Sequence, residues 1–414
     1  MKDTELYTAL LRLGTPWVVR EVRLDVAAER VDVWIEEAAG AGWCCPECGQ
    51  AAPVYDHAEE RVWRHLDTCE CRTYLHARLP RVECREHGVR QVPARWASPG
   101  SQFSLRMESR LIDTLKECDV TGATRLTGTS WDEAWGTVEK AVSRGLARKE
   151  RRIPPYLCVD EKAFAKHHRY ETVICDAQRG TVEYVVEDRK QESLEAYFHQ
   201  FTTEELAQVQ AVAMDRWEPY VAATRACVPG AEKKIVFDKF HVLRTVSEAV
   251  DKVRRREHQV LQAEGDERLK GTKHLWLANE ENIPEWRRAE FAAVKDENLK
   301  TSRAWAIKES LRTFWTLDRD AAADHFRRWY FWATHSRLAP VVKAAKTLHT
   351  HWANILTYFE HHVTNATAEG LNSKIQMVKE MACGFRNRQH YKTAIYFHCG
   401  GLNLYPSAVT PGKA

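Results

Sequence analysis

The most constraining feature of the sequence is a series of short apolar segments between residues 156 and 237. Residues 156–161, 170–176 and 181–186 are rich in β-branched and aromatic residues and are bounded by glycine or charged clusters, which is typical of strands. A helical segment follows, and then two more apolar segments at 208–214 and 234–237 enclose a second helical segment. The predicted order is three strands, helix, strand, helix, strand.

Three aspartates follow these segments or end them: Asp160, Asp215 and Asp238. The order of elements predicts an α/β core of the ribonuclease-H-like class, in which the first and fourth strands are neighbours. We therefore expect Asp160, at the end of the first strand, to lie beside Asp215, where the two carboxylates can share metal ions. A single aspartate at a strand end is more often part of a surface turn, so this interpretation depends on the rest of the chain.

Six of the twelve cysteines lie between residues 44 and 84. Cys45 and Cys48 are separated by two residues, and Cys84 and His87 have the same spacing. Three thiolates and one imidazole form a tetrahedral set typical of structural zinc, and Gly49 permits a tight turn after the first pair. A reduced cysteine-rich loop is the alternative. The spare thiols that leave the ligand set open are Cys44, Cys69 and Cys71. Between the two pairs, residues 72–84 alternate as one basic strand.

Residues 104–150 change to helical periodicity. We expect a first helix broken at Thr121–Gly122, a short second helix, and a third that opens with a capping box of Ser130 and Glu133. Three short helices with a tight turn fit a helix-turn-helix, although any small helical bundle has the same pattern. Pro154 and Pro155 then mark a natural domain boundary.

Length, charge and hydropathy limit the functional classes. A chain of 414 residues has room for two to four domains. The net charge of +3 does not by itself indicate a nucleic-acid partner, so the local basic runs at 144–152 and 252–256 matter more, and each is commonly only a solvated helix face. The chain has no apolar run long enough for a membrane helix and no signal peptide at its N-terminus, so we expect a cytoplasmic protein with reduced cysteines.

Residues 242–360 are helical and rich in tryptophan, most of it expected in a core. Glu369 then lies in the first turn of a further helix, where it completes a possible set of three carboxylates with Asp160 and Asp215. Basic residues that follow it are candidates for phosphate contacts or for an exposed helix face.

The sequence resembles the ISL3 family of bacterial insertion-sequence transposases along nearly its whole length. The order and spacing of several segments together carry the resemblance. These segments are the knuckle Cys45–Gly49, the helical segment before the core, Val159–Glu161, His168–Tyr170, Met214–Arg216, Asp238–His241, Thr364–Asn372 and Cys383–Asn387.

The resemblance implies a DDE transposase in which Asp160, Asp215 and Glu369 hold two catalytic Mg²⁺ or Mn²⁺ ions. Asp238 and His241 match an aspartate–histidine element that follows the second catalytic aspartate in several such groups, so Asp238 is the alternative second ligand. The pair Cys84 and His87 departs from the expected cysteine spacing, which leaves the fourth zinc ligand open.

The implied partners are the terminal inverted repeats of the element and the target DNA, both double-stranded, bound by a homodimer or larger assembly in the cytoplasm near the nucleoid, with no membrane involved. A DNA-binding regulator without chemistry and a ribonuclease-H-like nuclease without strand transfer are the alternatives. The expected DNA contacts are Arg144, Arg148, Lys149, Arg151, Arg152, Lys374, Lys379, Arg386 and Arg388.

We therefore expect a multidomain α+β protein. Its predicted parts are a zinc-binding module at 1–100, a helix-turn-helix at 101–152, the first part of a ribonuclease-H-like core at 153–245, an all-α insertion at 246–360 and the rest of the core at 361–414.

Overall fold

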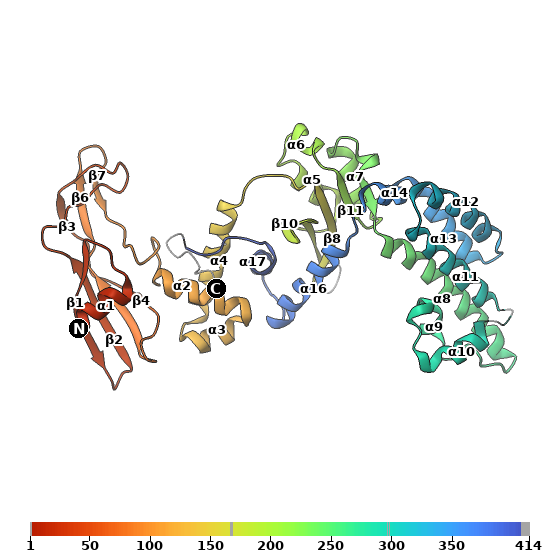
Figure 1. Cartoon of the computed structure of the whole chain (residues 1–414), viewed down its shortest axis with the longest axis horizontal. Helices are drawn as coiled ribbons and strands as arrows, with labels where there is room; N and C mark the ends of the chain where they lie inside the picture. The colour runs from red at the N-terminus through yellow and green to blue at the C-terminus, as the bar shows by residue number, and fades with distance from the viewer. Residues whose placement is uncertain (1, 166–168, 296, 298, 407–414) are drawn as a thin grey trace. The chain divides into compact units, whose positions relative to one another are not determined.

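The computed structural model describes residues 2–165, 169–295, 297 and 299–406 (Figure 1). The chain divides into two compact units. The first comprises Met1–Lys149, Lys379–Gly384 and Tyr396–Ala414, and the second comprises Glu150–Val378 and Phe385–Ile395. Within the described ranges, none of the helices has the length and apolarity needed to cross a membrane. His168, one of the residues that carry the family resemblance, lies outside the described residues.

The N-terminal part of the first unit contains two small sheets, ordered β1-β2-β5-β4 and β3-β6-β7. The prediction of one strand over residues 72–84 was wrong, because the chain leaves the first sheet after β5 and enters the second at β6. Pro80 is the first residue of β6, a position where its missing N–H costs no ladder hydrogen bond. The elements are α1 (Asp3–Leu11), β1 (Trp17–Asp25), β2 (Arg30–Glu37), β3 (Val54–His57), β4 (Arg61–Arg64), β5 (Arg72–Ala77), β6 (Pro80–Cys84) and β7 (Gly88–Gln91).

Tryptophans form much of the core of this part. The ring of Trp17 lies 5.2 Å from that of Trp43 and 5.0 Å from that of Trp96, and Trp96 is 5.5 Å from Trp63. All four side chains are buried. Large aromatic rings bury much apolar area per residue, which helps a small module with thin sheets to reach a stable core.

Three helices follow the two sheets in the first unit: α2 (Leu105–Glu117), α3 (Val120–Thr127) and α4 (Trp131–Arg148). The predicted capping box is confirmed, since Ser130 accepts from the N–H of Glu133, and the Glu133 side chain accepts from the N–H of Ser130. The predicted break at Thr121–Gly122 was wrong. Asp119 caps α3 by accepting from the N–H of Gly122, so the chain turns earlier and Gly122 lies inside α3.

The second unit contains a five-stranded mixed sheet of order β10-β9-β8-β11-β12. Its first three strands are antiparallel, and β11 runs parallel to both β8 and β12. The predicted order of elements is present, with one additional short helix. The elements are β8 (Tyr156–Ala165), β9 (Arg169–Asp176), β10 (Thr181–Glu187), α5 (Gln191–Phe198), α6 (Thr203–Ala207), β11 (Ala211–Met214), α7 (Glu218–Cys227), a 3-10 turn (Ala231–Lys233) and β12 (Ile235–Phe237).

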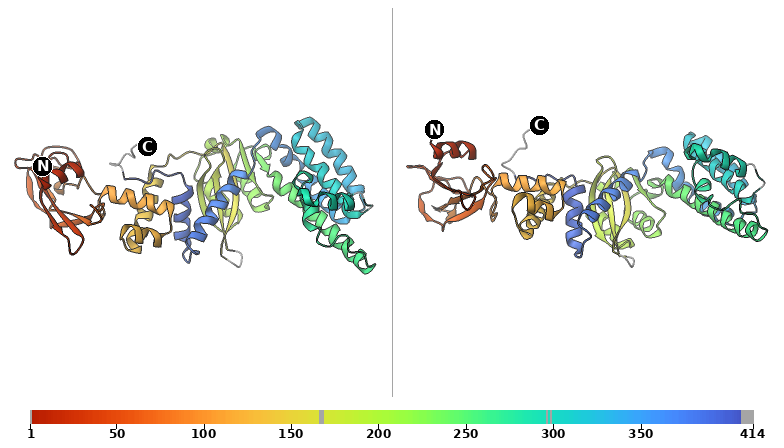
Figure 2. Two further views of the ribbon diagram at one scale, coloured as in Figure 1. Left: turned by 60° about the horizontal axis from the view of Figure 1, so that its bottom comes forward. Right: turned by 90° about the horizontal axis from the view of Figure 1, so that it is seen from below.

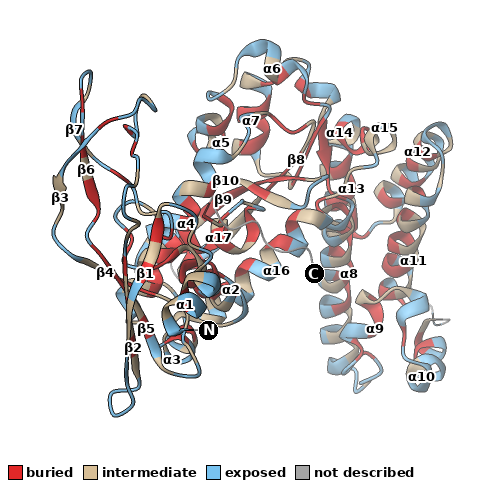
Figure 3. Cartoon of the chain, turned by 60° about the vertical axis from the view of Figure 1, so that its left-hand side comes forward, coloured by how far each residue is buried: buried red, intermediate tan, exposed pale blue. Residues whose placement is uncertain are grey.

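A helical region follows β12 and is drawn in green to blue in Figure 2. Its long helix α8 packs against α11 and α13, and each helix turns its buried face inward (Figure 3). The region consists of α8 (Lys239–Ala263), α9 (Lys273–Leu277), α10 (Glu285–Lys295), α11 (Lys300–Thr313), α12 (Arg319–His335), α13 (Ala339–Thr350), α14 (Trp352–Leu356), α15 (Tyr358–His361) and 3-10 turns at Glu280–Asn282 and Phe314–Thr316.

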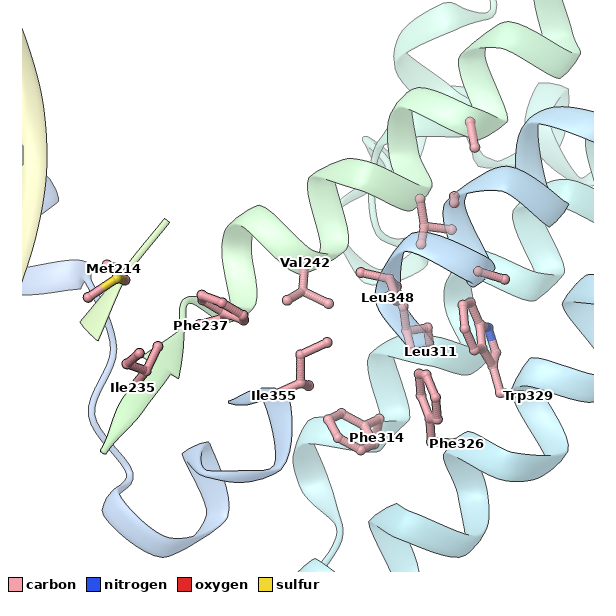
Figure 4. Packing of buried hydrophobic residues seen from close by; sticks show 14 of the residues in the cluster. Met214, Ile235, Phe237, Val242, Leu311, Phe314, Phe326, Trp329, Leu348 and Ile355 are labelled. Carbon is pink, nitrogen blue, oxygen red and sulfur yellow. The ribbon is translucent and has the colours of Figure 1, made fainter. Parts of the chain in front are cut away.

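The core of this region is aromatic, as the sequence predicts. Trp276, Trp305 and Trp329 are buried, whereas Trp286 is 81% exposed. Figure 4 shows Trp329, Phe326 and Phe314 beside Leu311, with Val242 of α8 and Leu348 of α13 continuing the same cluster toward β12. One hydrophobic core therefore runs from the sheet into the helices.

The helical region begins and ends at the same strand. It leaves the sheet at Asp238, directly after β12. On its return, the Thr357 hydroxyl donates to the carbonyl oxygen of Ile235 at 2.6 Å, and the Asn354 amide donates to the carbonyl oxygen of Glu232 at 3.2 Å. The chain then forms α16 (Ala366–Met381) and α17 (Arg388–Cys399).

Candidate functional site

The register of the sheet places Asp160 and Asp215 next to one another. Met214, the last residue of β11, is paired with Val159 of β8, and both aspartates follow directly. We had expected Asp160 at the end of its strand. This was wrong, because β8 continues past Asp160 and pairs with β9 as far as Ala165. Burial raises the pKa of the Asp160 carboxyl, and the nearby charge of Asp215 raises it further. Two acidic groups thus share one edge of the sheet.

A second group of metal-ligating side chains forms where α8 begins. Donor atoms of Asp238, His241 and Glu369 all lie within 4.8 Å of one another. Asp238 is 3% exposed; its Oδ1 accepts from the backbone N–H of Asn365 at 3.4 Å, and its Oδ2 has no hydrogen-bond partner. A buried carboxylate oxygen without a donor is unfavourable unless a cation approaches it.

His241 connects these two groups. Its Nε2 lies 3.8 Å from Asp215 Oδ2, and its Nδ1 lies 3.4 Å from Asp238 Oδ2. The pKa of His241 is raised by the contact with Asp238, against the effect of burial, and the charge of Asp215 adds to the rise. Across the described residues, Asp160, Asp215 and Glu369 do not themselves form a cluster as tight as that of Asp238, His241 and Glu369.

Asn372 joins the helix of Glu369 to the strand of Asp160. The two residues of α16 are three positions apart and so lie on one face of the helix. The Asn372 amide donates to Asp160 Oδ2 at 2.7 Å, and Lys162 Nζ donates to the Asn372 carbonyl oxygen at 3.1 Å. Asn372 was not predicted as a functional residue, although its spacing of three positions from Glu369 places both on one face of a helix.

Glu161 and Arg189 were also missed. Burial raises the pKa of Glu161, and the charges of Asp160 and Asp215 raise it further. The Arg189 guanidinium lies 3.5 Å from the Glu161 carboxylate and is held between two rings, 4.3 Å from that of Tyr170 and 4.5 Å from that of Trp217. A fifth carboxylate, paired with a cation, therefore lies beside the aspartates.

The donor set suits a divalent cation that prefers oxygen ligands. Carboxylates dominate it, with the imidazole of His241 beside them. Asp238 Oδ2 and Glu161 Oε2 form no hydrogen bond, although His241 lies near the first carboxylate and Arg189 near the second. A bound cation would stabilise both carboxylates further.

The structure brings together Cys45, Cys48, Cys84 and His87, whose donor atoms also lie within 4.8 Å of one another. Cys48 Sγ is 3.6 Å from Cys84 Sγ, and His87 Nδ1 is 3.5 Å from Cys84 Sγ and 3.9 Å from Cys45 Sγ. These separations fit the edges of a tetrahedron around zinc. The contact with His87 lowers the pKa of Cys84 to about 6, which favours the thiolate that zinc binds.

Glycines shape both halves of this cluster. Gly49 follows Cys48 with a φ of 73°, and Gly88 follows His87 with a φ of 65°. Both values lie in the left-handed region that glycine adopts without strain, so each ligand pair ends in a tight turn. Cys44 is exposed, and among the described residues neither it nor Cys69 nor Cys71 joins the cluster.

Several of the expected DNA contacts have partners inside the protein. Arg144 pairs with the buried Glu108, and Arg148 donates to the carbonyl oxygen of Tyr405 at 2.6 Å. The other internal pairs are Arg151 with Glu205, Arg152 with Asp176, and Arg388 with Glu171 and Glu187. Lys374 and Arg386 are exposed, Lys379 is half-buried, and Lys149 Nζ is buried. Each of these paired arginines therefore joins two segments that are distant in the sequence, a structural role that does not depend on DNA.

Comparison with known sequences decides the family. The transposase profile of the ISL3 family of DDE transposases matches residues 157–395, which is more than half of the chain. The chain belongs to the ISL3 family of transposases. Two further profiles match in order before it: the zinc finger of transposases IS204, IS1001, IS1096 and IS1165 at residues 41–87, and the helix-turn-helix domain of ISL3 transposases at residues 91–142.

Whole-length relatives agree with this ISL3 assignment. The chain is 27% identical over 424 aligned positions to the transposase for insertion sequence element IS1557 of Mycobacterium tuberculosis, covering 94% of each protein. It is also 27% identical to the transposase for IS1001 of Bordetella parapertussis, covering 84% of this chain and 86% of that one. The family predicted from the sequence is confirmed, and with it an enzyme that contains a zinc finger and a helix-turn-helix.

Proposed function

We propose that this transposase cuts DNA at the ends of its insertion sequence and joins the freed ends to target DNA by two-metal-ion chemistry in a ribonuclease-H-like core. The observation that carries the proposal is the pairing of β8 with β11, which sets Asp160 beside Asp215, together with the hydrogen bond from Asn372 that joins the helix of Glu369 to Asp160. The helices between β12 and α16 are then an insertion into this core.

We assign Asp160, Asp215 and Glu369 to the binding of two Mg²⁺ or Mn²⁺ ions. Ions in such a site activate the attacking oxygen and stabilise the leaving oxygen of a phosphodiester. The protein's own part is to fix the ligands: Asn372 orients the Asp160 carboxylate, and His241, between Asp215 and Asp238, fixes the position of both.

Asp238 is the alternative to Asp215. It is more deeply buried than Asp215, whose side chain is 34% exposed, and its donor oxygen lies within 4.8 Å of one from Glu369. We favour Asp215 because it is exposed enough to meet a phosphate and lies beside Asp160, whereas Asp238 is buried at the first position before α8.

The experiment that tests the proposal uses labelled duplexes that carry the terminal inverted repeats flanking this gene, incubated with Mg²⁺. We expect the wild-type protein to cut at the repeat ends and to transfer the strands to a second duplex, and Asp215→Ala to stop both reactions. If Asp238→Ala alone stopped them, Asp238 would replace Asp215 in the ligand set. Binding without cutting would favour the regulator, and cutting without joining would favour the nuclease.

The N-terminal parts are proposed to recognise the repeat ends. In this division, residues 1–100 form the zinc module, 101–152 the helix-turn-helix, 153–245 and 361–414 the core, and 246–360 the insertion. Cutting two ends together requires at least a homodimer on DNA. An enzyme that acts on the chromosome works in the bacterial cytoplasm at the nucleoid. Gel shifts with and without the repeat sequence, and light scattering of the complex, test these points.

A further inference from the structure

An open cleft between α8 and α13 carries a concentration of positive charge to which no part of the proposed catalytic site contributes. One wall is formed by Lys252 and Arg256 of α8, and the other by Lys343 of α13. Lys346 and Arg337 line an adjoining hollow on α13 that shares Lys343 and Thr347 with the cleft. All five side chains are exposed. The two helices pack directly against each other, so both walls belong to one rigid surface.

These five cations have no acidic partner within the described residues. No ion pair joins any of them to a carboxylate, and the one acidic residue that lines the cleft, Glu248, is paired with Arg244 at 3.2 Å. Other cations of α8 do have acidic partners, since Arg254 and Arg255 both pair with Asp251. In the basic run 252–256, Arg254 and Arg255 are thus paired with an acidic residue, and Lys252 and Arg256 line the cleft.

The position of the cleft on α8 relates it to the carboxylates. His241, Thr245, Glu248, Lys252 and Arg256 follow one another at intervals of three or four residues and so lie along one face of the helix. At a rise of about 1.5 Å per residue, Lys252 lies about 16 Å and Arg256 about 22 Å along the axis from His241. A duplex that runs along the axis of α8 advances about 3.4 Å per base pair, so on that path these distances correspond to about 5 to 7 base pairs.

We propose that the cleft between α8 and α13 binds the phosphate backbone of duplex DNA about 5 to 7 base pairs from the phosphate that reacts at the carboxylates. The inference rests on the proposed function for the location of the reacting phosphate. Exposed lysines and arginines without partners are the usual contacts to DNA phosphates, and they position a duplex without reading its sequence. The first turn of α13 lines the cleft, so the positive end of that helix adds to the attraction.

The DNA backbone in the cleft can lie on the transposon side or on the flanking side of the cleavage point. The contacts between phosphates and cationic side chains are the same in both cases. The test measures binding of the full-length protein to a repeat-end duplex as a function of salt, without added Mg²⁺. The test variant is Lys252→Gln/Arg256→Gln/Lys343→Gln. The matched control, Lys300→Gln/Arg303→Gln/Arg328→Gln, removes three exposed cations of α11 and α12 that lie outside the cleft.

We expect the cleft variant to lower the slope of log K against log salt by about 0.9 for each phosphate contact that is removed, and the control variant to keep the wild-type slope. Hydroxyl-radical footprints should lose protection about 5 to 7 base pairs from the cleavage point, and the side on which they lose it identifies the source of the duplex. Lys343→Gln alone should show the same change in reduced size.

Equal slopes for the cleft and control variants, or an unchanged footprint, would overturn the proposal. This readout needs no cleavage. If the protein bound DNA through the cleft but never cut it, the proposed function would be refuted and the cleft proposal would stand. If the protein cut normally and the cleft variant kept the wild-type salt slope, the cleft proposal would be refuted and the proposed function would stand.

Discussion

The zinc cluster and the carboxylate site are both polar groups held close together, but they are assembled in different ways. Each half of the zinc cluster is a pair of ligands three positions apart, followed by a glycine that turns the chain. The carboxylates come from β8, from the ends of β11 and β12, and from α16, so more than two hundred residues separate Asp160 from Glu369. The first site is local in sequence and the second depends on the sheet.

This difference predicts different consequences of damage. Loss of zinc should unfold the small sheet β3-β6-β7 and spare the catalytic unit, because the strands of that sheet contribute little to the tryptophan core of the module. Loss of a carboxylate should spare the fold and stop the chemistry, because the sheet is held by an apolar core that extends into the helices.

The largest effect is expected from removal of zinc. Structural zinc contributes on the order of 10 kcal/mol to the folding of a small module, so a chelator should expose residues 41–91 to proteolysis and leave 156–395 resistant. Metal analysis should give about one zinc per chain. Cys45→Ser should lose the ion, whereas Cys44→Ser, the matched control, should keep it; loss of zinc from both variants would contradict the ligand set.

Asp160→Asn should lower the rate of end cleavage by about two to three orders of magnitude, the loss seen when a principal stabilising group of a transition state is removed. Binding to the repeat ends and the thermal unfolding temperature should stay near the wild-type values. Asp320→Asn, an exposed aspartate of α12, serves as the control. Normal cleavage by Asp160→Asn would remove the carboxylate site from the mechanism.

Asn372→Ala should have an intermediate effect, about 10-fold to 100-fold on cleavage, because residues that orient a metal ligand commonly contribute that much. The reason is the lost hydrogen bond to Asp160 Oδ2. The loss should be largest at low Mg²⁺ and smaller at high Mg²⁺, a recovery that a purely structural defect would not show. Ser373→Ala removes a hydroxyl that donates to the backbone carbonyl oxygen of Glu369 within α16 and should behave like wild type.

Gly49→Ala should have the smallest effect. An alanine held in the left-handed region costs roughly 1–2 kcal/mol, so the zinc module should unfold at a lower denaturant concentration but still bind one ion. Gly42→Ala is the control, because the φ of Gly42 is not positive and an added Cβ at that position would meet no atom within 4 Å. Equal stability of the two variants would show that the turn after Cys48 does not need glycine.

The sequence predicted the features that depend on neighbours along the chain. The spacing of Cys45, Cys48, Cys84 and His87 identified residues that the structure brings together, and the apolar segments gave the order of the strands. The capping box at Ser130 was likewise visible, since both of its partners lie within one turn.

Features that depend on distant partners were not predictable. Arg144 and Arg152 belong to a basic run that suggested DNA contact, but the carboxylates that pair with them, Glu108 and Asp176, are remote in sequence. The role of Asn372 depends on which strand faces α16. The helix break was misplaced because the side chain of Asp119 caps α3, and a glycine inside a helix looks like an interruption when only propensity is considered.

The return of the helical region to β12 has an evolutionary consequence. The helical region leaves the sheet after Phe237. On its return it is hydrogen-bonded to Ile235 and to Glu232 of the 3-10 turn before β12. Its two ends are therefore held at one place, whatever lies between them. Selection can therefore lengthen, shorten or recharge these helices without displacing Asp160 or Asp215. Among related transposases with different DNA preferences, sequence differences should therefore accumulate first in these helices, while the sheet that holds the aspartates stays the same.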